Sequence, residues 1–108
     1  MEIKCKVGDS IGMINKKYRE GNVEWCLLEG KITGIRMCKN GMRIYSKRFR
    51  PLDYEDVISN NDILMGNNRI MLVREVLLLT DEVRERVEAW IKWANENKDE
   101  VDSIISTI

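Results

Sequence analysis

Asn40-Gly41 constrains the fold of this chain more than any other local feature of its sequence. A type I′ hairpin turn requires positive φ at both central residues, and the pair Asn-Gly adopts that conformation most readily. The sequence therefore predicts an antiparallel hairpin in which residues 31–39 pair with residues 42–47. Gly34 lies inside the first of these strands, and a glycine inside a strand often marks a bulge or a sharp bend.

Further short apolar segments, separated by turn residues, predict more strands. Residues 10–17, 23–28 and 74–80 form such segments, and residues 62–73 read as a strand, a turn and a second strand. Gly21-Asn22 predicts a loop between the first two of them, and residues 52–58 predict one short helical turn.

The pattern changes at Thr80, which can cap a helix and is followed by Asp81 and Glu82, where the positive helix terminus favours carboxylates. The apolar residues after this cap have helical spacing, and the stripe resumes after a polar gap. Its members are Val83, Val87, Trp90, Ala94, Val101, Ile104, Ile105 and Ile108. The helix therefore either continues to the C-terminus or breaks between residues 95 and 98.

A chain of 108 residues is long enough for one hydrophobic core and too short for two. The order of elements predicts a single α+β domain. We expect a small, strongly bent antiparallel sheet or a small barrel of about five strands over residues 1–79, and one long C-terminal helix over residues 80–108. The chain shows no apolar run of the ~18 residues that a membrane span needs and no secretory signal at its start, so we expect no membrane association.

The chain has no histidine, which removes the side chain best suited to proton transfer near neutral pH and any Ser-His or Cys-His nucleophile. Three cysteines without C-x-x-C spacing argue against a disulfide framework and favour reduced thiols in a cytoplasmic protein. We therefore expect a protein that is not an enzyme and has no cofactor or metal. One acidic cluster could ligate a hard cation but matches no known loop motif, so a solvated loop is favoured. It comprises Asp53, Glu55, Asp56 and Asp62.

The net charge of zero hides an asymmetry along the chain. Residues 1–50 hold 12 Lys/Arg and 5 Asp/Glu, a charge of +7, and residues 51–108 hold 6 and 13, a charge of −7. This division indicates either a basic and an acidic face, or two halves that neutralise each other by packing together.

The basic half contains a candidate nucleic-acid interface in residues 31–50, which include seven basic residues and no acidic one. Basic side chains bind a phosphate backbone and aromatic rings stack on bases, so the two together suit a single strand. An ordinary solvated strand surface is the alternative. The candidate residues are Arg36, Lys39, Arg43, Tyr45, Lys47, Arg48 and Arg50.

The helical region offers two further surfaces. Trp93 lies at the margin of the apolar stripe, where it either closes the core or stands exposed as a binding hot spot. The stripe itself and the apolar end of the chain, residues 101–108, either pack on the domain or pair with a second copy, which predicts a possible homodimer through this helix.

Three segments give the chain its resemblance to short SH3-like barrel proteins of bacterial phages and prophages. They are KVGDSIGMIN (residues 6–15), EGKITGI (residues 29–35) and REVLLLTDEVRERVEAWI (residues 74–91), about a third of the chain, and the extension past Lys98 departs from the pattern. The resemblance implies a phage or mobile-element origin, a location in the host cytoplasm and no catalytic residues. Some phage proteins of this size are anti-CRISPR inhibitors of host defence.

Two functions follow as expectations. The first is a non-enzymatic protein that inhibits a host protein, such as a CRISPR-type defence nuclease complex, by occupying its surface with the basic strands, the acidic helix or Trp93. The second is direct nucleic-acid binding by the basic residues of the 31–50 hairpin.

Overall fold

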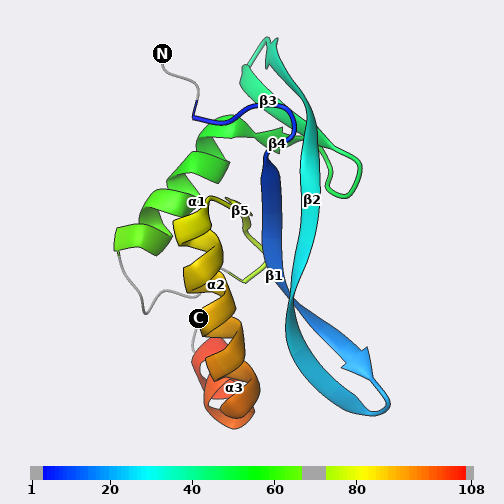
Figure 1. Ribbon diagram of the computed structural model, residues 1–108, viewed down its shortest axis with the longest axis vertical. Helices are drawn as coiled ribbons and strands as arrows, with labels where there is room; N and C mark the ends of the chain where they lie inside the picture. Colours follow the sequence, from blue (N-terminus) through cyan, green and yellow to red (C-terminus); the bar gives the residue numbers. More distant parts are fainter. Residues whose placement is uncertain (1–3, 67–72, 107–108) are drawn as a thin grey trace.

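The structure is a computed structural model that describes residues 4–66 and 73–106. Five strands form one antiparallel sheet in the order β4-β3-β2-β1-β5, which curls into a half-barrel (Figure 1). They are β1 (Ser10–Arg19), β2 (Asn22–Cys38), β3 (Gly41–Ser46), β4 (Leu52–Asp53) and β5 (Val76–Leu78). The predicted α+β class and bent antiparallel sheet are confirmed. Within the described residues no pairing joins β4 to β5, so the half-barrel is open between its outer strands.

Three helices accompany the sheet: α1 (Tyr54–Gly66), α2 (Asp81–Glu96) and α3 (Lys98–Ser106). The prediction of one long C-terminal helix is wrong, because the helix breaks at Asn97, whose backbone leaves the helical region at φ −133° and ψ 47°. The side-chain amide of Asn97 donates to the carbonyl of Trp93 at 2.9 Å. This bond satisfies a carbonyl that the helix end leaves without a partner. The break lets Val101 of α3 pack, fully buried, into the same core as α2.

The start of α2 agrees with its prediction. The hydroxyl of Thr80 accepts the backbone N–H of Val83 at 3.2 Å. Such a cap satisfies one of the backbone donors that a helix start leaves free, and Asp81 and Glu82 follow it in the first turn.

Helix α1 corrects two predictions. It is longer than the predicted turn over residues 52–58, and residues 62–65 are helical rather than a strand. The rest of that predicted strand–turn–strand unit, residues 67–72, lies outside the described residues. Tyr54, Val57 and Leu64 are buried along the helix at spacings of three and seven, which is helical period.

The two hairpins use different turns from those predicted. Glu20 and Gly21 both have positive φ, 50° and 82°, so this turn between β1 and β2 meets the type I′ requirement. At the predicted type I′ turn only Gly41 has positive φ, 120°, and Cys38 pairs with Gly41. The β2–β3 hairpin therefore exists as predicted, but its turn residues are Lys39 and Asn40.

Strand β2 runs unbroken through the two segments predicted as separate strands. Its residues up to Lys31 pair with β1, and its residues from Ile32 pair with β3. The register shifts between Ile32 and Gly34, so the irregularity predicted at Gly34 is confirmed. This change of partner lets one long strand turn the corner of the half-barrel.

The core lies on both faces of the sheet. Strand β5 shows this most directly, because Leu77 and Leu79 pack with α2 and α3, whereas Val76 and Leu78 pack with α1. A strand covered on both faces is apolar throughout rather than alternating, which explains its sequence.

Asparagine side chains from the helices bind open strand edges. The amide of Asn61 in α1 accepts the N–H of Leu78 at 2.8 Å and donates to its carbonyl at 2.7 Å. The amide of Asn95 in α2 accepts the N–H of Trp25 at 2.7 Å and donates to its carbonyl at 3.1 Å. Each side chain thus supplies the two bonds that a neighbouring strand would supply.

Candidate nucleic-acid interface

The β2–β3 register gathers part of the predicted interface on one face of the hairpin. Arg36 lies opposite Arg43, and Gly34 lies opposite Tyr45. Paired residues share a face of a sheet, and residues two apart along a strand share it too. Ile44, between Arg43 and Tyr45, is buried in the core beside α1. Arg36, Arg43 and Tyr45 therefore point away from α1.

Tyr45 forms the aromatic centre of this face. The guanidinium of Arg36 lies over its ring, 5.4 Å from the centroid, and the Tyr45 hydroxyl is 3.7 Å from the Cys38 sulfur. The interaction with Cys38, followed by partial desolvation, raises the pKa of Tyr45 above its ordinary value. The phenol therefore stays neutral around pH 7 and presents a half-exposed ring beside a cation.

The pair Arg36 and Arg43 places two positive charges directly opposite each other across the hairpin. Like charges in this arrangement are destabilising. Asp53 of β4 is the next residue across from Arg43 and supplies one carboxylate on this side. With one carboxylate for two guanidinium groups, this side of the hairpin keeps a net positive charge, which suits an anionic ligand.

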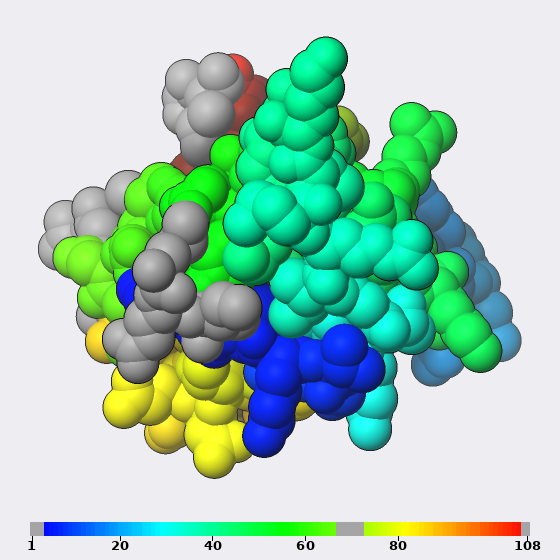
Figure 2. Space-filling view, turned by 90° about the horizontal axis from the view of Figure 1, so that it is seen from above, coloured from blue at the N-terminus to red at the C-terminus, as the bar shows by residue number. Residues whose placement is uncertain are grey.

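The remaining basic residues extend this charge at both ends of β3. Lys39 is exposed in the turn, and Lys47, Arg48 and Arg50 are exposed in the segment after the strand. Figure 2 shows the side chains of the β2–β3 hairpin, drawn in teal, standing out from this end of the molecule. We use the name basic hairpin for Arg36, Lys39, Arg43, Tyr45, Lys47, Arg48 and Arg50.

Trp93 does not belong to the basic hairpin. It is half-buried near the end of α2, 6.3 Å between ring centroids from Trp90, which in turn packs edge-on against Trp25 at 5.4 Å. These contacts place Trp93 at the margin of the core where α2 meets the first part of β2. The apolar stripe predicted for helix pairing packs into the core of this chain itself. Its residues Val83, Val87, Ala94 and Val101 are all buried.

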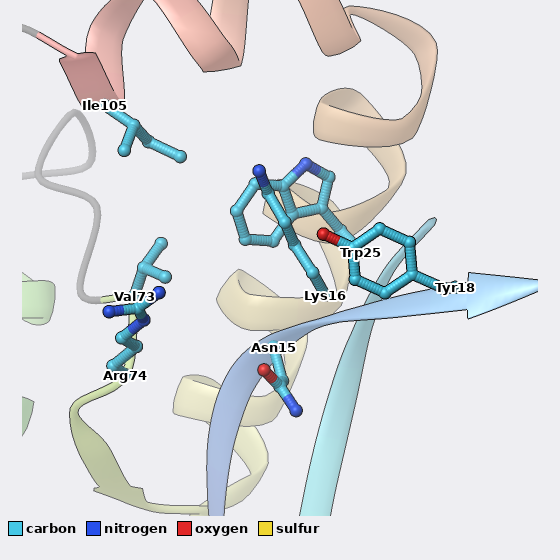
Figure 3. A pocket seen from close by; sticks show the side chains of 7 residues that line it. All are labelled: Asn15, Lys16, Tyr18, Trp25, Val73, Arg74 and Ile105. Carbon is cyan, nitrogen blue, oxygen red and sulfur yellow. The ribbon is translucent and has the colours of Figure 1, made fainter. Parts of the chain in front are cut away.

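The structure contains a groove that the sequence did not predict. It has a volume of about 460 Å³ and lies between the outer part of β1, the residues just before β5, and α3 (Figure 3). Two cations, Lys16 and Arg74, and the rings of Tyr18 and Trp25 line it. The only local signal is the basic run of residues 16–19, because Arg74 and Ile105 reach the groove only through the tertiary fold.

The acidic and basic halves of the sequence occupy different elements. Residues 1–50 supply the three long strands, and residues 51–108 supply all three helices. Ion pairs join strands to helices, Glu29 to Arg84 and Lys16 to Asp102. The bidentate hydrogen bonds of Arg84 hold the pKa of the Glu29 carboxyl below its ordinary value. This pair joins a helix cation to a strand acid, so it does not reduce the charge difference between the halves.

None of the helices in the described part of the chain is long and apolar enough to cross a membrane. The same residues contain no group of three or more potential metal ligands. Comparison of the chain with protein-family models, with curated proteins and with solved structures found no match.

Proposed function

We propose that this chain is a non-enzymatic binding protein whose basic hairpin binds single-stranded nucleic acid. The observation that carries the proposal is the Arg36–Arg43 pair with Tyr45 beside it, because it combines two opposed cations and a neutral ring on one face. The arginines would contact successive phosphates, and Tyr45 would stack on a base. The lysines and arginines at both ends of β3 would extend the phosphate contacts.

The test is a titration of a labelled, mixed-sequence single-stranded oligonucleotide at several salt concentrations. With about four phosphate contacts, the affinity should fall roughly fiftyfold between about 50 and 200 mM salt. The double variant Arg36→Glu/Arg43→Glu should lose at least about tenfold in affinity at low salt. The matched control is Lys92→Glu/Lys98→Glu, which makes the same charge change on the helices and should bind much more tightly than the hairpin variant.

A second pair of variants tests stacking. Tyr45→Ala should weaken binding about tenfold, because stacking on an aromatic ring is worth about 1–3 kcal/mol per base. Tyr18→Ala removes a tyrosine that is 78% exposed on another part of the molecule, and it should leave the affinity unchanged. The proposal would be refuted if the affinity did not fall with added salt, or if the two tyrosine variants lost the same affinity.

Helix α2 supports a second candidate, inhibition of a host protein that itself binds nucleic acid, such as a defence nuclease complex. Asp81, Glu85, Glu88 and Glu96 are exposed at helical spacing on one face, interrupted by Lys92. A row of carboxylates can occupy a channel built for phosphates. If this candidate is correct, the protein slows DNA cleavage by such a complex, and the variant Glu85→Lys/Glu88→Lys does not. Inhibition by that variant as strong as by the parent protein would exclude this candidate.

A further inference from the structure

Strand β1 pairs on one side for its whole length and on the other for only part of it. Its residues from Ser10 to Arg19 all pair with β2. On the opposite side, β5 pairs only with Ile11, Gly12 and Met13, and Val73 adds one bridge to Ile14. The outer part of β1 is therefore an open sheet edge within the described residues.

The backbone groups that face this open edge belong to Lys16 and Tyr18. The carbonyls of Ser10 and Ile14 accept hydrogen bonds on the β5 side, from Leu79 at 2.8 Å and Arg74 at 3.4 Å. Residues two apart along a strand direct their N–H and C=O groups to the same side. Lys16 and Tyr18 therefore present their N–H and C=O groups to this edge, and no described residue hydrogen-bonds to them there.

At other edges of the same sheet, helix side chains bind the open backbone groups. Asn95 binds the open edge of β2 at Trp25, and Asn60 and Asn61 bind the open edge of β5. At Lys16 and Tyr18, by contrast, the edge borders the groove of about 460 Å³ rather than a helix side chain that would satisfy it (Figure 3). Among residues 4–66 and 73–106, the fold thus blocks neighbouring edges and leaves space for an added chain at this one.

The chemistry of the groove defines its occupant. Trp25, Val73 and Ile105 give it an apolar floor, and Lys16 and Arg74 give it positive charge. Lys16 lies 5.0 Å from the centre of the Trp25 ring and 3.4 Å from a carboxylate oxygen of Asp102. Lys17 and Arg19 add two more cations along the strand. A second copy of the same edge would meet these cations with its own, so charge opposes pairing between copies.

We propose that the β1 edge at Lys16 and Tyr18 binds an extended acidic peptide of a partner protein as an added β-strand. The backbone of the peptide hydrogen-bonds to Lys16 and Tyr18. Its alternate side chains face opposite sides of the sheet. One set is apolar and packs over Val73 and Ile105, and the acidic set lies on the other face, beside Lys17 and Arg19. This site is separate from the basic hairpin and goes beyond nucleic-acid binding.

The test follows individual backbone amides by hydrogen exchange in NMR, with and without a capped octapeptide in which valine alternates with glutamate. Saturating peptide should slow the exchange of the Lys16 and Tyr18 amides by about tenfold or more. The amides of Lys17 and Arg19 face β2 and serve as internal controls that should not change. Unchanged exchange at Lys16 and Tyr18 would overturn the proposal.

Two matched peptides separate strand pairing from charge. Methylation of alternate backbone nitrogens keeps the side chains but removes donors on one edge, so the peptide methylated on its pairing edge should lose about tenfold or more in affinity. Replacement of glutamate by lysine should abolish binding, because the new cations oppose Lys17 and Arg19. If the methylated peptide binds as tightly as the parent peptide, strand addition is refuted. If the lysine peptide does, acidic specificity is refuted. Protection of Lys16 and Tyr18 that grows with protein concentration alone would instead identify a second copy as the occupant.

The peptide result is independent of the basic hairpin. The variant Arg36→Glu/Arg43→Glu should keep its peptide affinity while it loses nucleic-acid affinity, because both substitutions lie on the β2–β3 hairpin, outside the groove. Parallel loss of both activities would show that the two sites are one, and would overturn the proposal of a separate edge site.

Discussion

Glu20 has a backbone conformation that most residues avoid. Its φ of 50° lies in the left-handed region, which costs a residue with a Cβ roughly 1–2 kcal/mol. Together with Gly21 it forms the turn that joins β1 to β2, the longest strand pair in the sheet. The extensive pairing on both sides of the turn holds Glu20 in this conformation.

Replacement of this residue should stabilise the protein. Asparagine tolerates positive φ better than glutamate, and Asn-Gly is the preferred type I′ pair, so Glu20→Asn should raise the free energy of unfolding by about 1 kcal/mol. Urea denaturation measures the change. Glu24→Asn is the control, because Glu24 is exposed in the same hairpin without positive φ and asparagine should not stabilise it. A gain at Glu24 as large as that at Glu20 would contradict the explanation.

These turns also show what local sequence can and cannot predict. Asn40-Gly41 correctly predicted a hairpin but not its turn type, since only Gly41 adopts positive φ. Glu20-Gly21 is type I′ although glutamate has no preference for it. Residue preference therefore locates a turn, and the register of the paired strands decides its geometry.

At the scale of elements, helix side chains determine where the sheet ends. Asn95 binds both backbone groups of Trp25, and Trp25 is only 3% exposed. Asn95→Ala would leave a donor and an acceptor without partners at a protected edge, which costs about 1–3 kcal/mol of stability. Urea denaturation should show this loss, whereas Asn22→Ala, at an exposed position of the same strand, should change stability by less than about 0.5 kcal/mol. Equal effects would mean that the amide of Asn95 contributes no edge bond.

Two other asparagines explain why the full length of α1 was not predicted. Asn60 and Asn61 are typical of loops in a single sequence, because their side chains compete for backbone hydrogen bonds. In the structure these side chains bind β5, which is distant along the chain. The strands, the cap at Thr80 and the bulge at Gly34 depend on local patterns, so they were predictable, whereas the length of α1 depends on a tertiary contact.

The candidate sites also divide into those that local sequence predicts and those that depend on the tertiary fold. The basic hairpin was predictable because its residues are neighbours in sequence or across one turn. For Trp93 the sequence left open whether it closes the core or stands exposed, and the structure places it half-buried beside Trp90 at the margin of the core. The open edge at Lys16 and Tyr18 could not be predicted, because it depends on where β5 stops pairing with β1.

At the scale of the whole molecule, the two charged halves of the sequence fold into different elements. The sequence carries no net charge, yet the strand-forming half is +7 and the helix-forming half is −7. A charged matrix responds to the local surface rather than to the net charge. We therefore expect the protein to bind a cation-exchange matrix at pH 7 and low ionic strength, and to elute as added salt screens the basic hairpin.

Single charge reversals test whether the separation, and not the net charge, controls this retention. Arg36→Glu and Lys92→Glu change the net charge equally, but they act on different surfaces. The first acts on the basic hairpin, and the second lies within the row of carboxylates on α2, which we call the acidic stripe: Asp81, Glu85, Glu88 and Glu96. Arg36→Glu should therefore elute at clearly lower salt than the parent protein, and Lys92→Glu should elute close to it. On an anion-exchange matrix the order should reverse, because Lys92→Glu removes the one cation of the acidic stripe and strengthens binding. If both variants shift equally on each matrix, the two charged halves act as one averaged surface, and the basic hairpin loses its electrostatic basis as a separate interface.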